Sequence, residues 1–199
     1  MIHQFKTKSH DLPGLLNEVN LMSTFINRLQ RQAEFDPLRY DVNDYLGDGF
    51  EYFVEGFLEI LSPSPHIGVY KYRPIPPHED KGADGVGENI NRDKCVVQVK
   101  FRGNNEHLLT ANEDHLSNLM LAGMHMGVSF DQENPKNFRH FVFTTAKSLH
   151  FYTDEHMFEG KVKCFGLEDF RKMVDNNNHF WEEFRNRIRV EQQQLQQVV

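Results

Sequence analysis

The 199-residue sequence has no long hydrophobic run and only two cysteines. No apolar stretch approaches the roughly 20 residues that a membrane-spanning helix requires, so we expect no membrane partner. The first ten residues, MIHQFKTKSH, lack the apolar core of a signal peptide, and we therefore expect a cytoplasmic, intracellular protein. Two thiols, Cys95 and Cys164, are too few for a disulfide framework or for a zinc site made of cysteines alone.

Positive charge is also scarce. Lysine and arginine number 22 against 29 aspartates and glutamates, which gives a formal net charge of -7. Most dedicated nucleic-acid binders are basic, because their affinity comes largely from neutralising phosphates. The acidic balance therefore counts against phosphate binding by the surface as a whole. A local basic patch or a bound divalent cation could still attract phosphate.

The N-terminal region is predicted to be a helical arm, residues 1–46, that precedes a second domain, residues 47–199. We expect a helix from Asp11 to about residue 34, because apolar residues recur there at intervals of three and four. This apolar stripe is expected to form either core or the contact surface of a homodimer or larger assembly. It comprises Leu12, Leu15, Leu16, Val19, Met22, Phe25, Ile26 and Leu29.

The rest of the chain predicts an α/β fold. A helix over about Gly49 to Leu61 is ended by the run Ser62-Pro63-Ser64-Pro65, because proline cannot continue a helix. Another helix, further along the chain, is expected to end near Met126. The expected strands cover residues 66–73, two arms of a hairpin that turns at 91–93, residues 138–147 and residues 161–166. Strands interspersed with helices in this order indicate a mixed β-sheet flanked by helices.

One predicted strand combines a buried face with two polar side chains. In the run Val97-Gln98-Val99-Lys100 the two valines point to one face and Gln98 and Lys100 to the other, because side chains alternate along a strand. Upstream, the run GADGVG places Asp84 among small residues, which allow a ligand or another backbone to approach closely. The predicted hairpin can bring Asp84 towards Gln98 and Lys100.

These residue types suit the hydrolysis of phosphodiesters. Magnesium takes oxygen ligands, often one or two carboxylates completed by water and phosphate. Asp84 offers a carboxylate, Gln98 a neutral oxygen, and Lys100 a positive charge that can orient water or stabilise developing negative charge. The simpler interpretation is that Asp84 is a turn residue and Lys100 a solvated lysine of an edge strand.

The spacing of these residues also resembles a known family. Asp84, thirteen intervening residues and then Gln98-Val99-Lys100 resemble the D-x(n)-(D/E/Q)-x-K signature of PD-(D/E)XK nucleases. The glutamine variant is most similar to the Mrr-like restriction endonucleases. Residues 47–51, GDGFE, resemble the G-x-x-F-E pattern of that family's first helix. The runs FVFTTAK and KVKCFGLEDF resemble its later strands and closing helix, so that the resemblance covers roughly residues 47–175.

One residue departs from the family pattern, since Ala83 precedes Asp84 where the signature has proline. The resemblance implies a restriction-endonuclease-like fold and a Mg2+-dependent endonuclease, with DNA as the expected substrate. It implies Glu51, Asp84, Gln98 and Lys100 as catalytic residues. The metal would be held by Glu51, Asp84 and Gln98, and Mn2+ could substitute for Mg2+. Glu55, four residues after Glu51 on the same side of the helix, is the alternate ligand.

Several alternatives stay open. A nuclease of the same fold could act on RNA or branched DNA, and a non-catalytic nuclease-like subunit could bind nucleic acid or a protein, which the acidic charge would suit. One such site cuts one strand, so cleavage of both strands would require a dimer or a second binding event. Five basic residues either line one rim of the site or are scattered solubilising charge. They are Lys71, Arg73, Lys81, Arg102 and Lys147.

Overall fold

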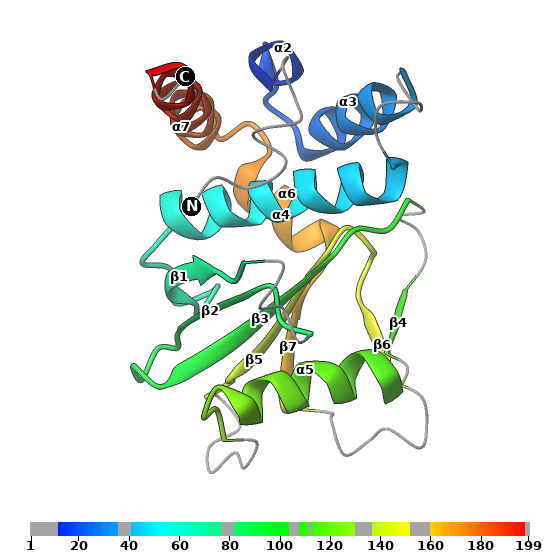
Figure 1. Cartoon of the computed structure of the whole chain (residues 1–199), viewed down its shortest axis with the longest axis vertical. Coiled ribbons are helices and arrows are strands. Elements are labelled where there is room, and N and C mark those ends of the chain that lie inside the picture. Colours follow the sequence, from blue (N-terminus) through cyan, green and yellow to red (C-terminus); the bar gives the residue numbers. More distant parts are fainter. Residues whose placement is uncertain are drawn as a thin grey trace. The chain divides into compact units, whose positions relative to one another are not determined.

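The computed structural model describes residues 12–35, 41–76, 82–103, 108–111, 113–129, 137–151 and 160–197. They form an α/β structure with a five-stranded mixed sheet, as predicted (Figure 1). Contacts divide the chain into two units. We call residues 61–168 the sheet unit, and residues 1–60 with 169–199 the helical unit. None of the helices described is both long enough and apolar enough to cross a membrane.

The sheet has the strand order β1-β2-β3-β5-β7. β1 pairs antiparallel with β2 and β2 with β3, whereas β3, β5 and β7 run parallel to one another. These strands span Tyr70–Pro74, Gly85–Glu88, Lys94–Lys100, His140–Thr144 and Val162–Phe165. Two further short strands, β4 (Leu109–Ala111) and β6 (Leu149–Phe151), pair parallel in a second sheet that the sequence pattern did not predict.

Helix α5 (Glu113–His125) covers one face of the sheet. Val96 of β3 and Val142 of β5 lie in the apolar core of this unit together with Leu119 of the helix. Gly123 allows the helix to approach closely, because a Cβ atom there would lie 2.7 Å from Nε2 of His140. Val97 and Val99, whose side chains alternate with that of Gln98, are buried as well.

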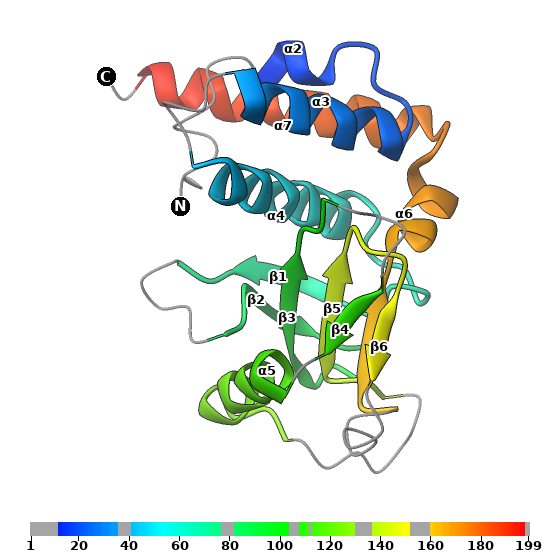
Figure 2. The same cartoon turned by 90° about the vertical axis from the view of Figure 1, so that its right-hand side faces the viewer.

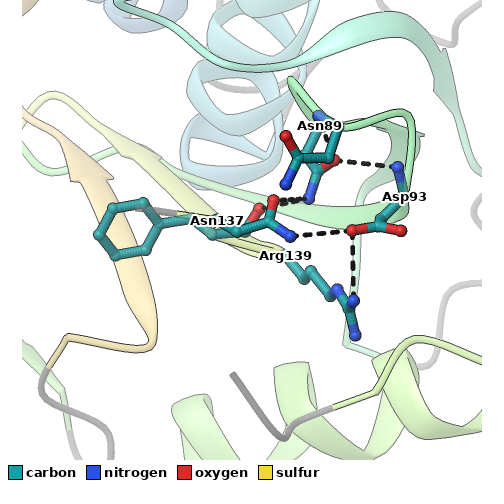
Figure 3. A network of polar contacts seen from close by, with 6 residues as sticks. Asn89, Asp93, Asn137 and Arg139 are labelled. Carbon is teal, nitrogen blue, oxygen red and sulfur yellow. Dashed lines mark hydrogen bonds and ion pairs between the residues drawn. The ribbon is translucent and has the colours of Figure 1, made fainter. Parts of the chain in front are cut away.

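The turn between β2 and β3 is held by side chains from two parts of the chain (Figure 3). The buried Asn89 accepts hydrogen bonds from the backbone N–H groups of Asn91 and Asp93, at 3.0 and 2.9 Å. Its amide nitrogen donates to Asn137, and Asp93 in turn accepts from Asn137 at 2.9 Å and from Arg139 at 3.2 Å. The predicted turn at residues 91–93 is therefore confirmed, and it is tied to the start of β5.

The helical unit has an aromatic core. Helices α2 (Leu12–Leu16), α3 (Met22–Phe35), α4 (Val42–Ile60) and α7 (Asn178–Gln197) form it with most of α6 (Leu167–Val174). α2 lies against α3 and α7 (Figures 1 and 2). Phe53 is fully buried, and its ring centroid lies 5.0 Å from that of Phe25 and 5.7 Å from that of Phe184. Each neighbouring ring comes from a different helix, so these residues join the beginning and the end of the chain.

The single N-terminal helix expected up to residue 34 is instead two helices. The chain leaves the helical conformation after Leu16, and Glu18 has a φ of 56°. Asp175 accepts the N–H of Met22 at 2.7 Å and caps the start of α3, while Arg28 donates to the carbonyl of Leu15 at 3.2 Å. The break is thus stabilised by residues outside the turn itself, which the apolar periodicity does not reveal.

The next helix, α4, begins earlier than Gly49, where we expected it. The carboxylate of Asp41 accepts the N–H groups of Asn43 and Asp44, at 2.9 and 3.1 Å, and so caps a helix that begins at Val42, seven residues before the expected start. The helix ends at Ile60, before the two prolines that were expected to stop it.

The division into units differs from the predicted boundary at residue 46. Residues 47–60 and 169–199, which we placed in the second domain, group with the N-terminal helices. The physical reason is the aromatic core, since Phe50 and Phe57 of α4 pack on Phe170 with ring centroids 5.7 and 4.9 Å away. The apolar stripe of residues 12–29 belongs to the same core, as its residues from Leu15 to Leu29 are buried within the chain.

Candidate active site

Asp84 and Gln98 lie on the same face of the sheet. The register pairs Val86 with Val96 and Gly85 with Val97, and its continuation by one residue places Asp84 opposite Gln98. Gln98 pairs with Val142 on the next strand, whose side chain lies in the core beneath α5. The predicted alternation is therefore confirmed: Gln98 and Lys100 point to the α5 face, and the two valines point to the opposite one.

Hydrogen bonds to the backbone fix both polar side chains. Oδ2 of Asp84 accepts the N–H of Val99 at 2.5 Å, and the N–H of Asp84 donates to the carbonyl of Val97 at 2.9 Å. The amide nitrogen of Gln98 donates to the carbonyl of Gly82 at 3.1 Å. Gln98 is only 4% exposed, whereas Asp84 is half-buried. The carboxylate and the amide are thus held together at one place on the hairpin.

Gly82 brings the chain close to α5 at this point. It has a φ of 105°, which favours glycine, and a Cβ atom there would lie 2.9 Å from Cβ of Asn118 and 3.0 Å from its backbone. Because Gly82 also accepts the Gln98 amide bond, the helix, the segment before β2 and the middle of β3 are coupled around the candidate site.

Lys100 is the last residue of β3 and is half-buried. Its carbonyl accepts the hydroxyl of Thr144 at 2.8 Å, and the same hydroxyl accepts the N–H of Ala146 at 3.1 Å. Thr145 then binds Arg102 twice: its hydroxyl accepts the Arg102 N–H at 2.7 Å and donates to the Arg102 carbonyl at 2.9 Å. Two fully buried hydroxyl groups therefore hold the chain where β3 ends.

The two candidate glutamates, Glu51 and Glu55, lie on α4 in the helical unit, whereas Asp84, Gln98 and Lys100 belong to the sheet unit. Glu55 is 5% exposed and forms an ion pair with Arg187 of α7, with Oε2 3.2 Å from Nη2. Glu51 is half-buried. The structure thus gathers three of the four predicted catalytic residues in one unit. The role of Glu51 stays a prediction from the sequence.

The donor set of the sheet unit suits a hard cation. Asp84 and Gln98 provide a carboxylate and an amide oxygen, and Mg2+ is commonly held by one or two carboxylates with water and substrate phosphate. Within the described ranges, no three His, Cys, Asp or Glu side chains gather as a closed metal site. Asp84 and Gln98 supply two oxygen ligands of the kind that Mg2+ takes, and water and phosphate would complete its shell.

The five basic residues do not form a single group. Lys71 pairs with Glu88 at 2.9 Å, and Arg73 is an exposed residue of β1. Lys81 lies outside the described residues. Arg102 and Lys147 lie just beyond the ends of the neighbouring strands β3 and β5. Only these two are placed close to Lys100 by the strand pairing.

Thr144 and Thr145 were not predicted from the sequence. The run FVFTTAK contains the signal, since two hydroxyl residues directly follow a buried strand, where backbone groups no longer have a ladder partner. Their partners on β3 could not be inferred without the parallel pairing of β3 and β5.

Comparison with known proteins supplies no relative. No protein-family model matches the chain, and neither a curated protein nor a solved structure does.

Proposed function

We propose that this protein is a Mg2+-dependent nuclease with a restriction-endonuclease-like fold, hydrolysing phosphodiester bonds in DNA. The observation that carries the proposal is the grouping of Asp84, Gln98 and Lys100 on one face of the β2–β3 hairpin. The mixed sheet, with β3 followed by parallel β5 and β7, agrees with the fold that the sequence motif implies.

Each residue has a distinct chemical role in this proposal. Asp84 and Gln98 would hold Mg2+, with Glu51 retained as a ligand predicted from the sequence. The bound ion would polarise the phosphate and lower the pKa of a water molecule. The ammonium group of Lys100 would orient the attacking water and offset the negative charge that develops on the phosphate. The Thr144 hydroxyl would position Lys100 through its backbone carbonyl.

The decisive experiment measures cleavage of labelled duplex, single-stranded and branched DNA, and of RNA, with Mg2+, Mn2+, Ca2+ or EDTA. We expect cleavage with Mg2+ or Mn2+, little turnover with Ca2+, and none with EDTA. Lys100→Ala should lower the rate by about 100- to 1,000-fold while the unfolding transition stays unchanged. Lys94→Ala is the matched control, since Lys94 is the exposed first residue of the same strand.

Activity that survives complete chelation would refute the metal mechanism. Wild-type turnover of Lys100→Ala, with Lys94→Ala equally active, would show that Lys100 is only a surface residue. Preferential cleavage of RNA would keep the chemistry and change the substrate.

A second candidate, a non-catalytic nuclease-like subunit, is favoured by one observation. Both key polar groups bond to the backbone of their own hairpin: Asp84 to Val99, and Gln98 to Gly82. This arrangement could simply stabilise the hairpin. In that case Asp84→Asn should lower stability, and no metal should promote cleavage by the wild-type protein.

A further inference from the structure

The carboxyl ends of three parallel strands meet at one edge of the sheet. In Figure 2 the arrows of β3 and β5 point the same way, and β7 is parallel to β5. The segments stay together past the last strand pair, Lys100 with Thr144, because Leu167 donates its N–H to the carbonyl of Ala146 at 2.9 Å. In open α/β sheets, ligands bind just outside the carboxyl ends of the strands.

The backbone of Arg102 is fixed at this edge by a buried side chain of the neighbouring segment. Both of its backbone polar groups bond to the fully buried Thr145 hydroxyl, at 2.7 and 2.9 Å. Its guanidinium donates from Nη1 to the carbonyl of Phe101 at 3.0 Å. The half-buried side chain lies two residues beyond Lys100, the last residue of β3.

Lys147 lies three residues beyond the end of the neighbouring strand β5. Its backbone is packed tightly, since a Cβ atom on Gly166 would lie 2.2 Å from the Lys147 carbonyl oxygen, yet its side chain is exposed. Beyond β7 the exposed charged residue is instead Glu168. Among the described residues that follow these three strands, the ends of β3 and β5 thus carry Arg102 and Lys147, and the end of β7 carries Glu168.

We propose that Arg102 and Lys147 bind backbone phosphates of the nucleic-acid strand that Lys100 acts on. The inference rests on the proposed nuclease function and adds the residues that would hold the substrate. Arginine matches phosphate oxygens in a forked, bidentate geometry and lysine acts as a point charge. A protein with a net charge of -7 can bind phosphate at such an edge, because only the local electrostatic potential has to be positive.

The test measures binding without cleavage. Fluorescence anisotropy of a labelled DNA duplex is recorded in EDTA over a series of salt concentrations, for the full-length wild type, Arg102→Gln, Lys147→Gln and the control Lys94→Gln. Lys94 is an exposed lysine at the opposite end of β3, so its replacement removes the same charge from the same strand. Single-stranded DNA and RNA of the same sequence are titrated in parallel, since a phosphate contact is common to all three.

We expect each edge variant to weaken binding roughly tenfold, as the loss of a charge-assisted hydrogen bond would. Each should also make the negative slope of log K against log salt on the duplex shallower by about 0.9, the value for one phosphate contact. Lys94→Gln should change neither quantity. Edge variants that keep the wild-type affinity and slope would overturn the inference, as would a wild type that binds none of the three ligands.

Thr145 provides a second test that does not remove a charge. Thr145→Ser should keep the wild-type salt slope, whereas Thr145→Val should lower affinity in the wild type but not in an Arg102→Gln background. Equal losses in both backgrounds would mean that Thr145 acts on stability alone and would overturn its positioning role.

The outcomes separate the two proposals. Edge variants that lose binding, in a protein that never cleaves with Mg2+, would support the phosphate-binding edge and refute the nuclease. Normal binding by the edge variants, in a protein that cleaves with Mg2+, would refute the edge alone.

Discussion

Two glutamates four residues apart on α4 have different surroundings, and the difference can be measured. Glu55 is buried and paired with Arg187, which also contacts Glu59 at 3.0 Å. Glu55→Gln should lower the free energy of unfolding by about 1–3 kcal/mol, because it leaves a largely buried guanidinium with less opposing charge. Glu51→Gln should leave stability unchanged and reduce cleavage, since we expect Glu51 to be a metal ligand.

Urea unfolding and cleavage assays on both variants check this pair. A normal cleavage rate for Glu51→Gln would remove Glu51 from the site. If Glu55→Gln lost activity at unchanged stability, Glu55 would become the ligand instead.

His140 makes stability depend on pH. Burial, followed by the charge of Arg139, lowers the pKa of the His140 imidazole to about 4 from 6.5. The imidazole therefore binds a proton at a higher pH in the unfolded chain than in the folded one. The contribution of His140 to the free energy of unfolding is fully present above pH 6.5 and is lost as the pH drops towards 4. The loss attributable to His140 should be about 3 kcal/mol.

The measurement is urea unfolding at intervals between pH 7 and 4 for the wild type and His140→Gln. The variant should show a flatter profile over this range. Asp93 affects stability in a lower pH range. The hydrogen bond from Asn137 holds the pKa of the Asp93 carboxyl below 3.8, so the contribution of Asp93 to the free energy of unfolding is lost only below that pH. A variant profile as steep as that of the wild type would assign the acid sensitivity to other groups.

At the scale of elements, the close approach of Gly82 to α5 positions the start of β2. Gly82→Ala places a side chain at a φ of 105° and within 3.0 Å of Asn118, so it should cost about 2–4 kcal/mol of stability. It should also disturb the Gln98 amide, which donates to the Gly82 carbonyl. Thermal unfolding measures the first effect and metal titration the second.

Gly103→Ala is the matched control for this prediction. A Cβ atom at Gly103 would meet nothing within 4 Å, and the residue has no positive φ, so the change should be neutral or slightly stabilising. Equal stability of the two variants would show that Gly82 does not pack closely against Asn118 of α5.

At the scale of the whole molecule, the N-terminal stripe closes the core of the helical unit. Phe25 is 2% exposed, and its ring centroid lies 5.0 Å from that of Phe53 and 6.2 Å from that of Trp181. Phe25→Ala should therefore lower the free energy of unfolding by about 3–5 kcal/mol without changing the mass in solution.

Chemical unfolding and light scattering check these two expectations. A homodimer remains a prediction, but the buried stripe of residues 12–29 no longer supports it. Dissociation of an assembly by Phe25→Ala at unchanged stability of the folded chain would restore that stripe as a contact surface.

The sequence by itself determined the features that depend on near neighbours. Alternation along β3 placed Gln98 and Lys100 on one face, and the turn at residues 91–93 returned Asp84 to them. Pro63 and Pro65 follow the end of α4, as expected. Such features need only the local geometry of a strand, a turn or a helix, which a single stretch of sequence specifies.

Only the tertiary structure decided the features whose partners are distant in the chain. Asp175 caps α3 from 153 residues away, and Thr145 holds Arg102 from 43 residues away. Glu55 pairs with Arg187, which lies 132 residues further along the chain. The regular spacing of the glutamates on α4 does not reveal that Glu55 is buried in this pair while Glu59, which also contacts Arg187, is exposed. Buried polar groups must find partners wherever the fold brings them, so the identity of those partners depends on packing between elements and not on spacing along the sequence.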